Sequence, residues 1–139
     1  MKTSTLIDTN ILIEVWGPVS RTASWASGAL TQCRRDGALV VSPLVWSEIA
    51  PMMHDEGHLD AFTSELGIEK ELVPWSGAFQ AGVIHARYRK AGGKRERTLP
   101  DFLIGAHALV GGHRLLTRDA SRYRTYFPDL QIIAPDTHP

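Results

Sequence analysis

Short apolar runs of the kind found in β-strands alternate with helical patterns along the chain, and this alternation constrains the fold more than any other feature. The strand-like runs cover residues 3–7, 38–42, 68–74, 114–117 and 130–134. The helical patterns cover residues 20–37, 43–50, 58–66, 76–91 and 98–110. Strands separated by helices form parallel sheets that are covered by helices on both faces. We therefore expect an α/β fold, a three-layer α/β/α sandwich with a central parallel sheet.

Several helix ends have clear local signals. Ser42 and Pro43 form an N-cap and first-turn pair, and Pro51 must end or kink the helix that they start. A further helix is expected to begin near Asn10, where Asp8 could serve as its cap. The helix at 76–91 carries apolar side chains on one face, namely Phe79, Val83 and Ala86.

Length and composition favour a single soluble domain over residues 1–139. A chain of this length is typical of one domain, and its apolar fraction of 43% and charged fraction of 22% are near globular averages. No apolar run approaches membrane-spanning length, and the N-terminal residues lack the apolar centre of a secretory signal. Cys33 is the only cysteine, so the chain cannot form an internal disulfide. We expect a cytoplasmic protein without a membrane partner.

Acidic residues stand at the ends of expected strands and the starts of expected helices. Asp8 follows the first strand, and Asp119 follows the run at 114–117. In an open parallel sheet the ligand crevice lies beyond the carboxyl ends of the strands, so both acids should project toward one edge. Each acid has a simpler interpretation when taken alone: Asp8 as a helix cap, Asp101 as part of a capping box with Thr98, and Asp119 as a turn residue.

Glu48 is harder to explain as an ordinary structural residue. It lies four residues from both Leu44 and Met52, which places it in the apolar stripe expected to face the core. Burying an unpaired carboxylate costs several kcal/mol. Glu48 should therefore pair with an Arg, a Lys or a metal ion, or be exposed in a cleft.

The four acids together point to a metal site. Clustered carboxylates repel one another and raise at least one pKa unless cations neutralise them. All four are hard oxygen ligands, and no cysteine or histidine cluster accompanies them. Such a set suits Mg²⁺ or Mn²⁺ and does not suit tetrahedral zinc.

Four segments, in order along the chain, resemble the PIN domain, and more closely the VapC-type ribonuclease toxins of bacterial type II toxin–antitoxin modules. They are "LIDTNILIE" near the N-terminus, "SE" on the helix after the second strand, "LPDFLIGAHA", and "LLTRDASRYRTYFPDLQIIAP". The resemblance covers essentially the whole chain, and the last segment is its most specific part.

The resemblance implies an endoribonuclease that depends on Mg²⁺ or Mn²⁺. Its acidic quartet falls on Asp8, Glu48, Asp101 and Asp119, with Asn10 and Thr117 as polar neighbours. We expect Asp8 and Asp101 to hold the principal ion, and metal-activated water to hydrolyse RNA. The resemblance also implies a cognate antitoxin that blocks the acidic site, and self-association as a homodimer.

Basic residues are concentrated in one part of the chain, although the formal net charge is zero. Residues 87–124 hold ten of the fifteen Lys and Arg. Contacts of Lys and Arg with phosphates give affinity and salt dependence but little sequence specificity. The candidates for contact with RNA are Lys94, Arg95, Arg97 and Arg118. The alternative for the basic run at 87–97 is a solvated loop, and Arg118 could instead pair with a site acid.

Other interpretations remain open or are disfavoured. A phosphoaspartate switch also places acids at strand ends, but Asp8-Thr9-Asn10 lacks the second aspartate of the phosphatase signature. A non-catalytic RNA-binding or partner-binding module on the same fold is the main alternative. The stretch "HDEGH" is unlike a zinc-protease helix because its Glu stands third and Gly57 disfavours the helix. His107 is expected to be a packed or surface residue. The tryptophans are expected in the core or at an interface, with the core as the default: Trp16, Trp25, Trp46 and Trp75.

Overall fold

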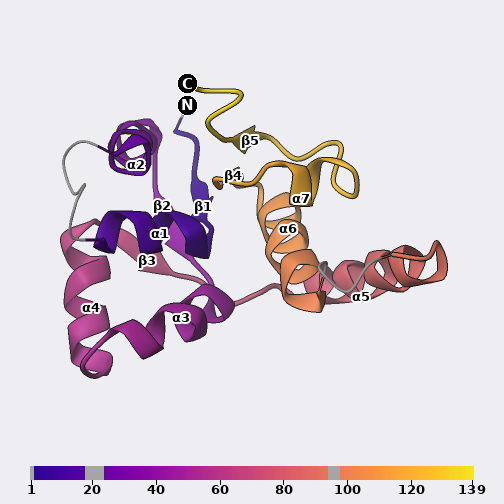
Figure 1. Ribbon diagram of the computed structural model, residues 1–139, viewed down its shortest axis with the longest axis horizontal. Helices are drawn as coiled ribbons and strands as arrows, with labels where there is room; N and C mark the ends of the chain where they lie inside the picture. The colour runs from indigo at the N-terminus through magenta and orange to yellow at the C-terminus, as the bar shows by residue number, and fades with distance from the viewer. Residues whose placement is uncertain (1, 18–23, 94–97) are drawn as a thin grey trace.

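A five-stranded parallel sheet forms the centre of the protein, as seen in a computed structural model that describes residues 2–17, 24–93 and 98–139 (Figure 1). Its strands are β1 (Thr5–Ile7), β2 (Leu39–Val41), β3 (Ile68–Lys70), β4 (Arg114–Leu116) and β5 (Ile132–Ile133). The strand order is β3-β2-β1-β4-β5, and every neighbouring pair is parallel. The predicted α/β/α fold with a parallel sheet is confirmed.

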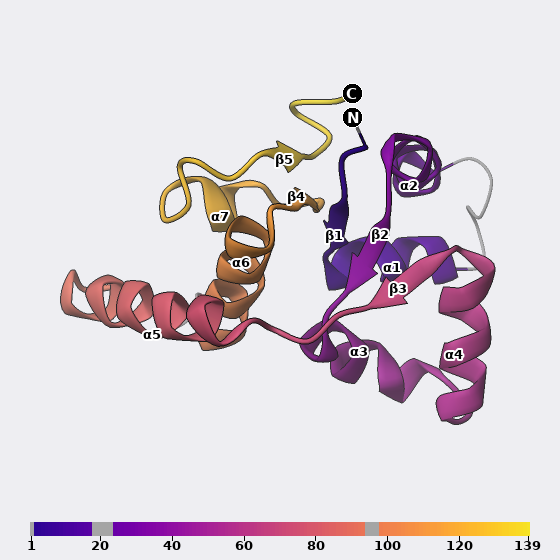
Figure 2. The same cartoon turned by 180° about the vertical axis from the view of Figure 1, so that it is seen from behind.

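The helices form two groups on either side of β1 (Figures 1 and 2). The first group is α1 (Thr9–Trp16), α2 (Trp25–Asp36), α3 (Pro43–Ile49) and α4 (Glu56–Glu65). The second group is α5 (Trp75–Lys90), α6 (Leu99–Gly111) and α7 (Ser121–Arg124). Within these groups α1 packs against α2 and α3, and α6 packs against α5 and α7.

The central strand is buried from end to end. Thr5, Leu6 and Ile7 of β1 are all fully buried, and β1 pairs with β2 on one side and β4 on the other. Strands covered on both faces lack the alternation of apolar and polar residues found in half-exposed sheets. This burial fixes the register of β1, and with it the position of the residues that follow its carboxyl end.

Two predicted boundaries were wrong, and each has a local cause. The third strand was expected to extend to residue 74, but β3 ends at Lys70 and the side chain of Leu72 is 79% exposed. Pro74 cannot donate to a strand ladder and serves instead as the N-cap residue of α5. The helix expected from residue 20 begins at Trp25 in the described part of the chain, where the Ser24 hydroxyl accepts a hydrogen bond from the Ser27 amide. Residues 20–23 lie outside the described residues.

Other boundaries agree with the sequence. Ser42 caps α3 through its hydroxyl, Pro43 occupies the first turn, and the α-helix ends at Ile49. A 3₁₀ turn, η1 (Ala50–Met52), contains Pro51 and follows directly. The expected end or kink at Pro51 is therefore confirmed.

The first half of helix α5 faces the protein with small residues, whereas large apolar residues of the same segment face solvent. Gly77 and Ala81 are buried, and the backbone of Gly77 lies close to that of Ala106 on α6. The face that carries Phe79 is exposed, and Trp75 at the start of the helix is 92% exposed. The default placement of Trp75 in the core was wrong, because the small residues of α5 allow close packing on α6 only on the opposite side.

The remaining tryptophans behave as expected. Trp16, Trp25 and Trp46 are partly buried and pack against the apolar core. No helix in the described ranges is both long and apolar enough to cross a bilayer.

Candidate active site

Asp8 is a buried carboxylate directly beyond the carboxyl end of β1. It is the N-cap of α1, and its Oδ1 accepts a hydrogen bond from the Thr9 amide at 2.8 Å. Its Oδ2 accepts two more hydrogen bonds, from the Thr117 hydroxyl at 2.8 Å and from the Tyr123 hydroxyl at 2.9 Å. The predicted role as a helix cap is confirmed, but it uses only one of the two carboxylate oxygens.

The surroundings of Asp8 disfavour its charged form. Burial raises the pKa of Asp8, and the negative charge of Asp101 raises it further, although the three hydrogen bonds act in the opposite direction. Asp101 therefore lies close enough to interact with Asp8 electrostatically. Its carboxylate stands in the first turn of α6 and is mostly buried.

Arg122 lies between Asp101 and Asp119. Its Nε donates to Asp119 Oδ2 at 2.9 Å, and its Nη1 lies 3.7 Å from Asp101 Oδ1. Burial alone would lower the pKa of Arg122, but the charges of the two aspartates outweigh this effect and raise it. The guanidinium thus partly neutralises two acids of the predicted quartet.

The capping and turn alternatives apply to these two aspartates only in part. Thr98 is the N-cap of α6, but its side chain makes no capping hydrogen bond, so the Thr98 contribution to the predicted capping box is absent. Asp119 accepts a hydrogen bond from the Ser121 hydroxyl at 2.6 Å, as a turn residue would. Its second oxygen is bound to Arg122, as described above.

Glu48 is exposed, which corrects its predicted place in a buried stripe. The residues of α3 that face the core are Val45 and Ile49, one position along from Leu44 and Glu48. The seven-residue helix turns its core-facing side toward α1, and the Glu48 carboxylate comes to lie beside Thr9. Thr9 Oγ1 donates to Glu48 Oε1 at 3.2 Å. Glu48 therefore adjoins the Asp8 turn from the solvent side.

A single hydroxyl joins the turns after β1 and β4. Thr117 Oγ1 donates to Asp8 and accepts hydrogen bonds from Asn10 Nδ2 at 3.2 Å and from the Asp119 amide at 3.1 Å. Asn10 Oδ1 in turn accepts from the Arg118 amide at 3.1 Å. Asn10 and Thr117 thus hold the two acid-bearing turns together. The sequence predicted them only as polar neighbours of the acids.

The predicted basic residues fall into two groups. Arg118 forms an ion pair with Glu14, with Nη1 2.9 Å from Oε1, and its guanidinium also lies over the Trp25 ring. Its partner is thus an acid outside the predicted quartet. Lys94, Arg95 and Arg97 lie outside the described residues.

The histidines of "HDEGH" do not form a zinc-protease helix. His54 precedes α4, which begins at Glu56, and the His54 amide donates to His58 Nδ1 at 3.0 Å. His107 is fully buried on α6, as one of its two expected placements required.

Comparisons with known proteins identify the family of this chain. A family model of the PIN domain matches residues 5–128, which include the turns after β1 and β4 and the whole of α6. The chain belongs to the PIN domain family. A comparison with curated protein sequences gave no match.

Solved structures share the fold of this PIN domain at low sequence identity. A chain of the VapBC2 complex from Rickettsia felis, bound to a DNA fragment from its promoter, aligns with a TM-score of 0.73 at 17% identity, covering 95% of this chain and 98% of that one. A toxin–antitoxin complex from Klebsiella pneumoniae gives 0.68 at 21% identity, with 94% and 97% covered. VapC20 of Mycobacterium tuberculosis, a toxin that cleaves the sarcin-ricin loop, gives 0.53 at 15% identity, with 79% and 85% covered.

The acids of this PIN domain form an open arrangement. Among the described residues, the group of acidic or imidazole side chains with ligand atoms all within 4.8 Å of one another is Glu71, His107 and His113, and no three of the four predicted acids approach so closely. Mg²⁺ retains several water ligands and binds proteins through one or two carboxylates. The repulsion between Asp8 and Asp101 would also be relieved by a cation. The donor set therefore fits a hydrated hard cation.

Sequence reasoning missed two contributors to the site of this PIN domain. Tyr123 is fully buried with its hydroxyl on Asp8, and Arg122 bridges two aspartates. Both lie on α7, which has only four residues and therefore too little length for a helical pattern to be recognised. Their position three and four residues after Asp119 was the available signal.

Proposed function

We propose that this PIN domain is a metal-dependent endoribonuclease that acts as the toxin of a toxin–antitoxin pair. The observation that carries the proposal is the buried Asp8 at the carboxyl end of β1, which accepts three hydrogen bonds and whose pKa is raised by burial and, to a smaller extent, by the charge of Asp101. Burying a carboxylate lowers the stability of a protein, so a buried acid of this kind points to a function that needs its charge. Resemblance to VapC toxins in sequence and fold supports the same assignment.

In the proposed site Asp8 and Asp101 hold the principal Mg²⁺ or Mn²⁺ ion, and Glu48 and Asp119 complete the site or hold a second ion. Bound Mg²⁺ lowers the pKa of a water ligand and neutralises charge on a phosphate, which favours hydrolysis to a 5′-phosphate and a 3′-hydroxyl. Thr117 and Tyr123 keep the Asp8 carboxylate ionised and oriented, because their hydroxyls donate to it.

RNA is proposed to lie across the acidic edge of the sheet, with basic side chains on its backbone. Lys94, Arg95 and Arg97 precede Asp101 in the sequence, and Arg118 precedes Asp119. Arg118 is half exposed and its ion pair with Glu14 lies at the surface, where such pairs contribute about 0–1 kcal/mol. A phosphate could therefore replace Glu14 as its partner at little cost.

We propose two protein partners, a cognate antitoxin and a second copy of this chain. The antitoxin is supported by the VapBC and other toxin–antitoxin complexes that share the fold. The homodimer is supported by the exposed apolar surface of Leu72, Trp75, Phe79 and Val83, hereafter the α5 patch. Exposed apolar patches mark interaction sites in soluble proteins. We also propose that residues 1–139 form one nuclease domain that acts in the cytoplasm.

The direct test is cleavage of end-labelled RNA by the purified chain in Mg²⁺, in Mn²⁺ and in EDTA. We expect cleavage with either metal, products with 5′-phosphates, and none in EDTA. Asp8→Asn should lose activity, whereas Asp129→Asn, at an exposed acid outside the quartet, should retain it. RNA that is bound but not cleaved under every condition would instead favour a non-catalytic binding module.

A further inference from the structure

A second cluster of ligating side chains lies outside the acidic quartet. Glu71 directly follows β3, His107 lies on α6, and His113 directly precedes β4. Glu71 Oε2 is 2.7 Å from His107 Nε2 and 2.6 Å from His113 Nε2. Two imidazole nitrogens and one carboxylate oxygen thus converge on one point.

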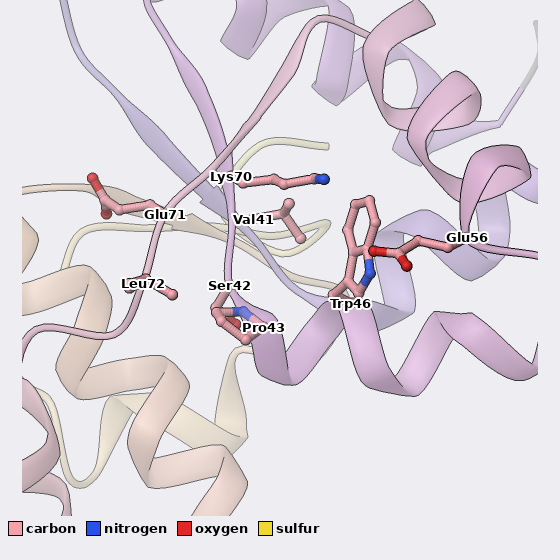
Figure 3. Close-up of a pocket in the computed structure, with 8 residues that line it drawn as sticks. All are labelled: Val41, Ser42, Pro43, Trp46, Glu56, Lys70, Glu71 and Leu72. Carbon is pink, nitrogen blue, oxygen red and sulfur yellow. The ribbon is translucent and has the colours of Figure 1, made fainter.

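The cluster is separate from the acidic site. His107 is six residues beyond Asp101 on α6, which corresponds to about 9 Å along the helix axis. Figure 3 shows the Glu71 side chain directed away from those of Lys70 and Trp46, which line a neighbouring pocket of about 240 Å³. Glu71 also lines this pocket, and its Oε2 contacts the two histidines.

The burial of the three side chains is suited to binding a metal ion. His107 is fully buried, and His113 is almost so, whereas 41% of the Glu71 side chain is exposed. Buried imidazoles keep their orientation, and the exposed carboxylate leaves a route for an ion to enter. Ser4 Oγ lies 2.6 Å from His113 Nδ1, the kind of second contact that orients a metal-bound histidine.

The other imidazole has an unsatisfied atom. His107 Nδ1 is buried and, among the described residues, lacks a hydrogen-bond partner. The polar contact of this buried ring is the one that its Nε2 makes with Glu71. Nε2 can therefore bind a metal ion in exchange for that contact. The hydroxyl of Ser4 can accept as well as donate, so His113 can carry its proton on Nδ1 and present a free Nε2 lone pair.

We propose that Glu71, His107 and His113 form a binding site for Zn²⁺ or a similar transition-metal cation, distinct from the acidic quartet. Two histidines and one glutamate form a recognised zinc ligand set, with water in the fourth position. Imidazole favours zinc over magnesium, so the two sites select different ions. Ligand atoms on tetrahedral zinc stand roughly 3.3 Å apart at bond lengths of about 2.0 Å. The distances of 2.7 and 2.6 Å from Glu71 Oε2 to the two imidazole nitrogens are shorter than this, so the exposed Glu71 carboxylate must move outward to admit the ion.

A bound ion would join three parts of the fold. It would tie the residue after β3 to α6 and to the residue before β4. Because the ion binds the folded chain and not the unfolded one, it raises the melting temperature. At a hundredfold excess over its dissociation constant we expect an increase of about 5–10 °C.

The test is calorimetric titration of the full-length, metal-stripped chain with ZnCl₂, together with thermal melting in the presence and absence of zinc. We expect one zinc per chain and binding weakened at least tenfold by Glu71→Gln and by His113→Ala. Glu71→Gln is nearly isosteric, and the side chain that it replaces is partly exposed, so this variant is expected to fold. It therefore tests the proposal even if His113→Ala does not fold.

Two controls separate this site from the others. The double variant His54→Ala, His58→Ala removes a histidine pair outside the cluster and should bind zinc as wild type does. Asp8→Asn should also retain zinc binding, so the result does not depend on the proposed nuclease activity. Absence of stoichiometric zinc binding by the folded chain, or equal affinity in wild type and Glu71→Gln, would overturn the proposal and identify the cluster as a hydrogen-bonded pair of histidines on a carboxylate only.

Discussion

Replacement of Tyr123 by Phe tests how the buried Asp8 carboxylate is held. The Tyr123 ring is fully buried and its hydroxyl donates to Asp8 Oδ2 at 2.9 Å, so Tyr123→Phe removes one hydrogen bond and leaves the packing intact. A hydrogen bond to a charged group contributes about 1.5–3 kcal/mol, and one to a neutral group about 0.5–1.5 kcal/mol. A loss of about 2 kcal/mol lowers the melting temperature of a domain of this size by roughly 5–8 °C.

The loss should depend on pH in a defined direction. Burial raises the pKa of Asp8 in the folded state, so its contribution to stability is fully present below the unfolded pKa and decreases as the pH rises through the folded pKa. Removing the Tyr123 hydroxyl weakens the charged form further, which raises the folded pKa again. We therefore expect Tyr123→Phe to lose more stability at pH 7 than at pH 4.

Chemical denaturation at the two pH values, with Tyr126→Phe as the matched control, measures this difference. Tyr126 lies three residues further along the chain and packs on Tyr88 and Phe102, but is not among the hydrogen-bond donors to Asp8. Equal stability of Tyr123→Phe and wild type at both pH values would show that the phenol does not support the carboxylate.

Three further perturbations probe the charges and surfaces around the site. Arg122→Ala removes the cation that bridges two aspartates, so Mg²⁺ affinity measured by calorimetry should rise by about fivefold, the equivalent of one surface ion pair; an unchanged or lower affinity would exclude competition between the guanidinium and the metal. The double variant Trp75→Ser, Phe79→Ser disrupts the α5 patch and should convert a dimer to a monomer in size-exclusion chromatography with light scattering, whereas a dimer that persists would place the interface elsewhere. The double variant Lys94→Ala, Arg95→Ala should weaken RNA binding and reduce the slope of log K against log salt by about 1.4, as two lost phosphate contacts on a single strand require; an unchanged slope would mean that neither residue contacts the backbone.

Most of the fold could be predicted because its signals are local. The alternation of apolar runs and helical patterns predicted the parallel sheet, and Ser42 with Pro43 predicted the start of α3. The end of β3 was wrong because apolar residues such as Leu72 satisfy a strand pattern equally well when they are exposed. Trp75 was misplaced for a related reason, since the sequence does not show which face of a helix has a partner.

The site was predicted less completely because its contacts are long-range. The position of Asp8 after β1 was readable from the sequence, but its hydrogen bonds from Thr117 and Tyr123 join residues more than one hundred positions apart. The prediction that Glu48 lies in a core-facing stripe was wrong because residue spacing does not show which side of a helix faces the core. Glu71, His107 and His113 were not grouped because they lie on three different segments.

The central claim, metal-dependent RNA cleavage by four carboxylates, is tested most directly by single-turnover cleavage rates of isosteric variants in Mg²⁺. The variants are Asp8→Asn, Glu48→Gln, Asp101→Asn and Asp119→Asn, with Asp129→Asn and Glu65→Gln as controls at exposed acids. We predict that the rates of Asp8→Asn and Asp101→Asn fall by about 100-fold or more, a typical loss when a group that stabilises transition-state charge is removed. The rates of the other two site variants should also fall clearly below wild type. The rates of the two controls should be unchanged. Rates for all four site variants within about threefold of wild type, or cleavage that persists in EDTA, would contradict the account.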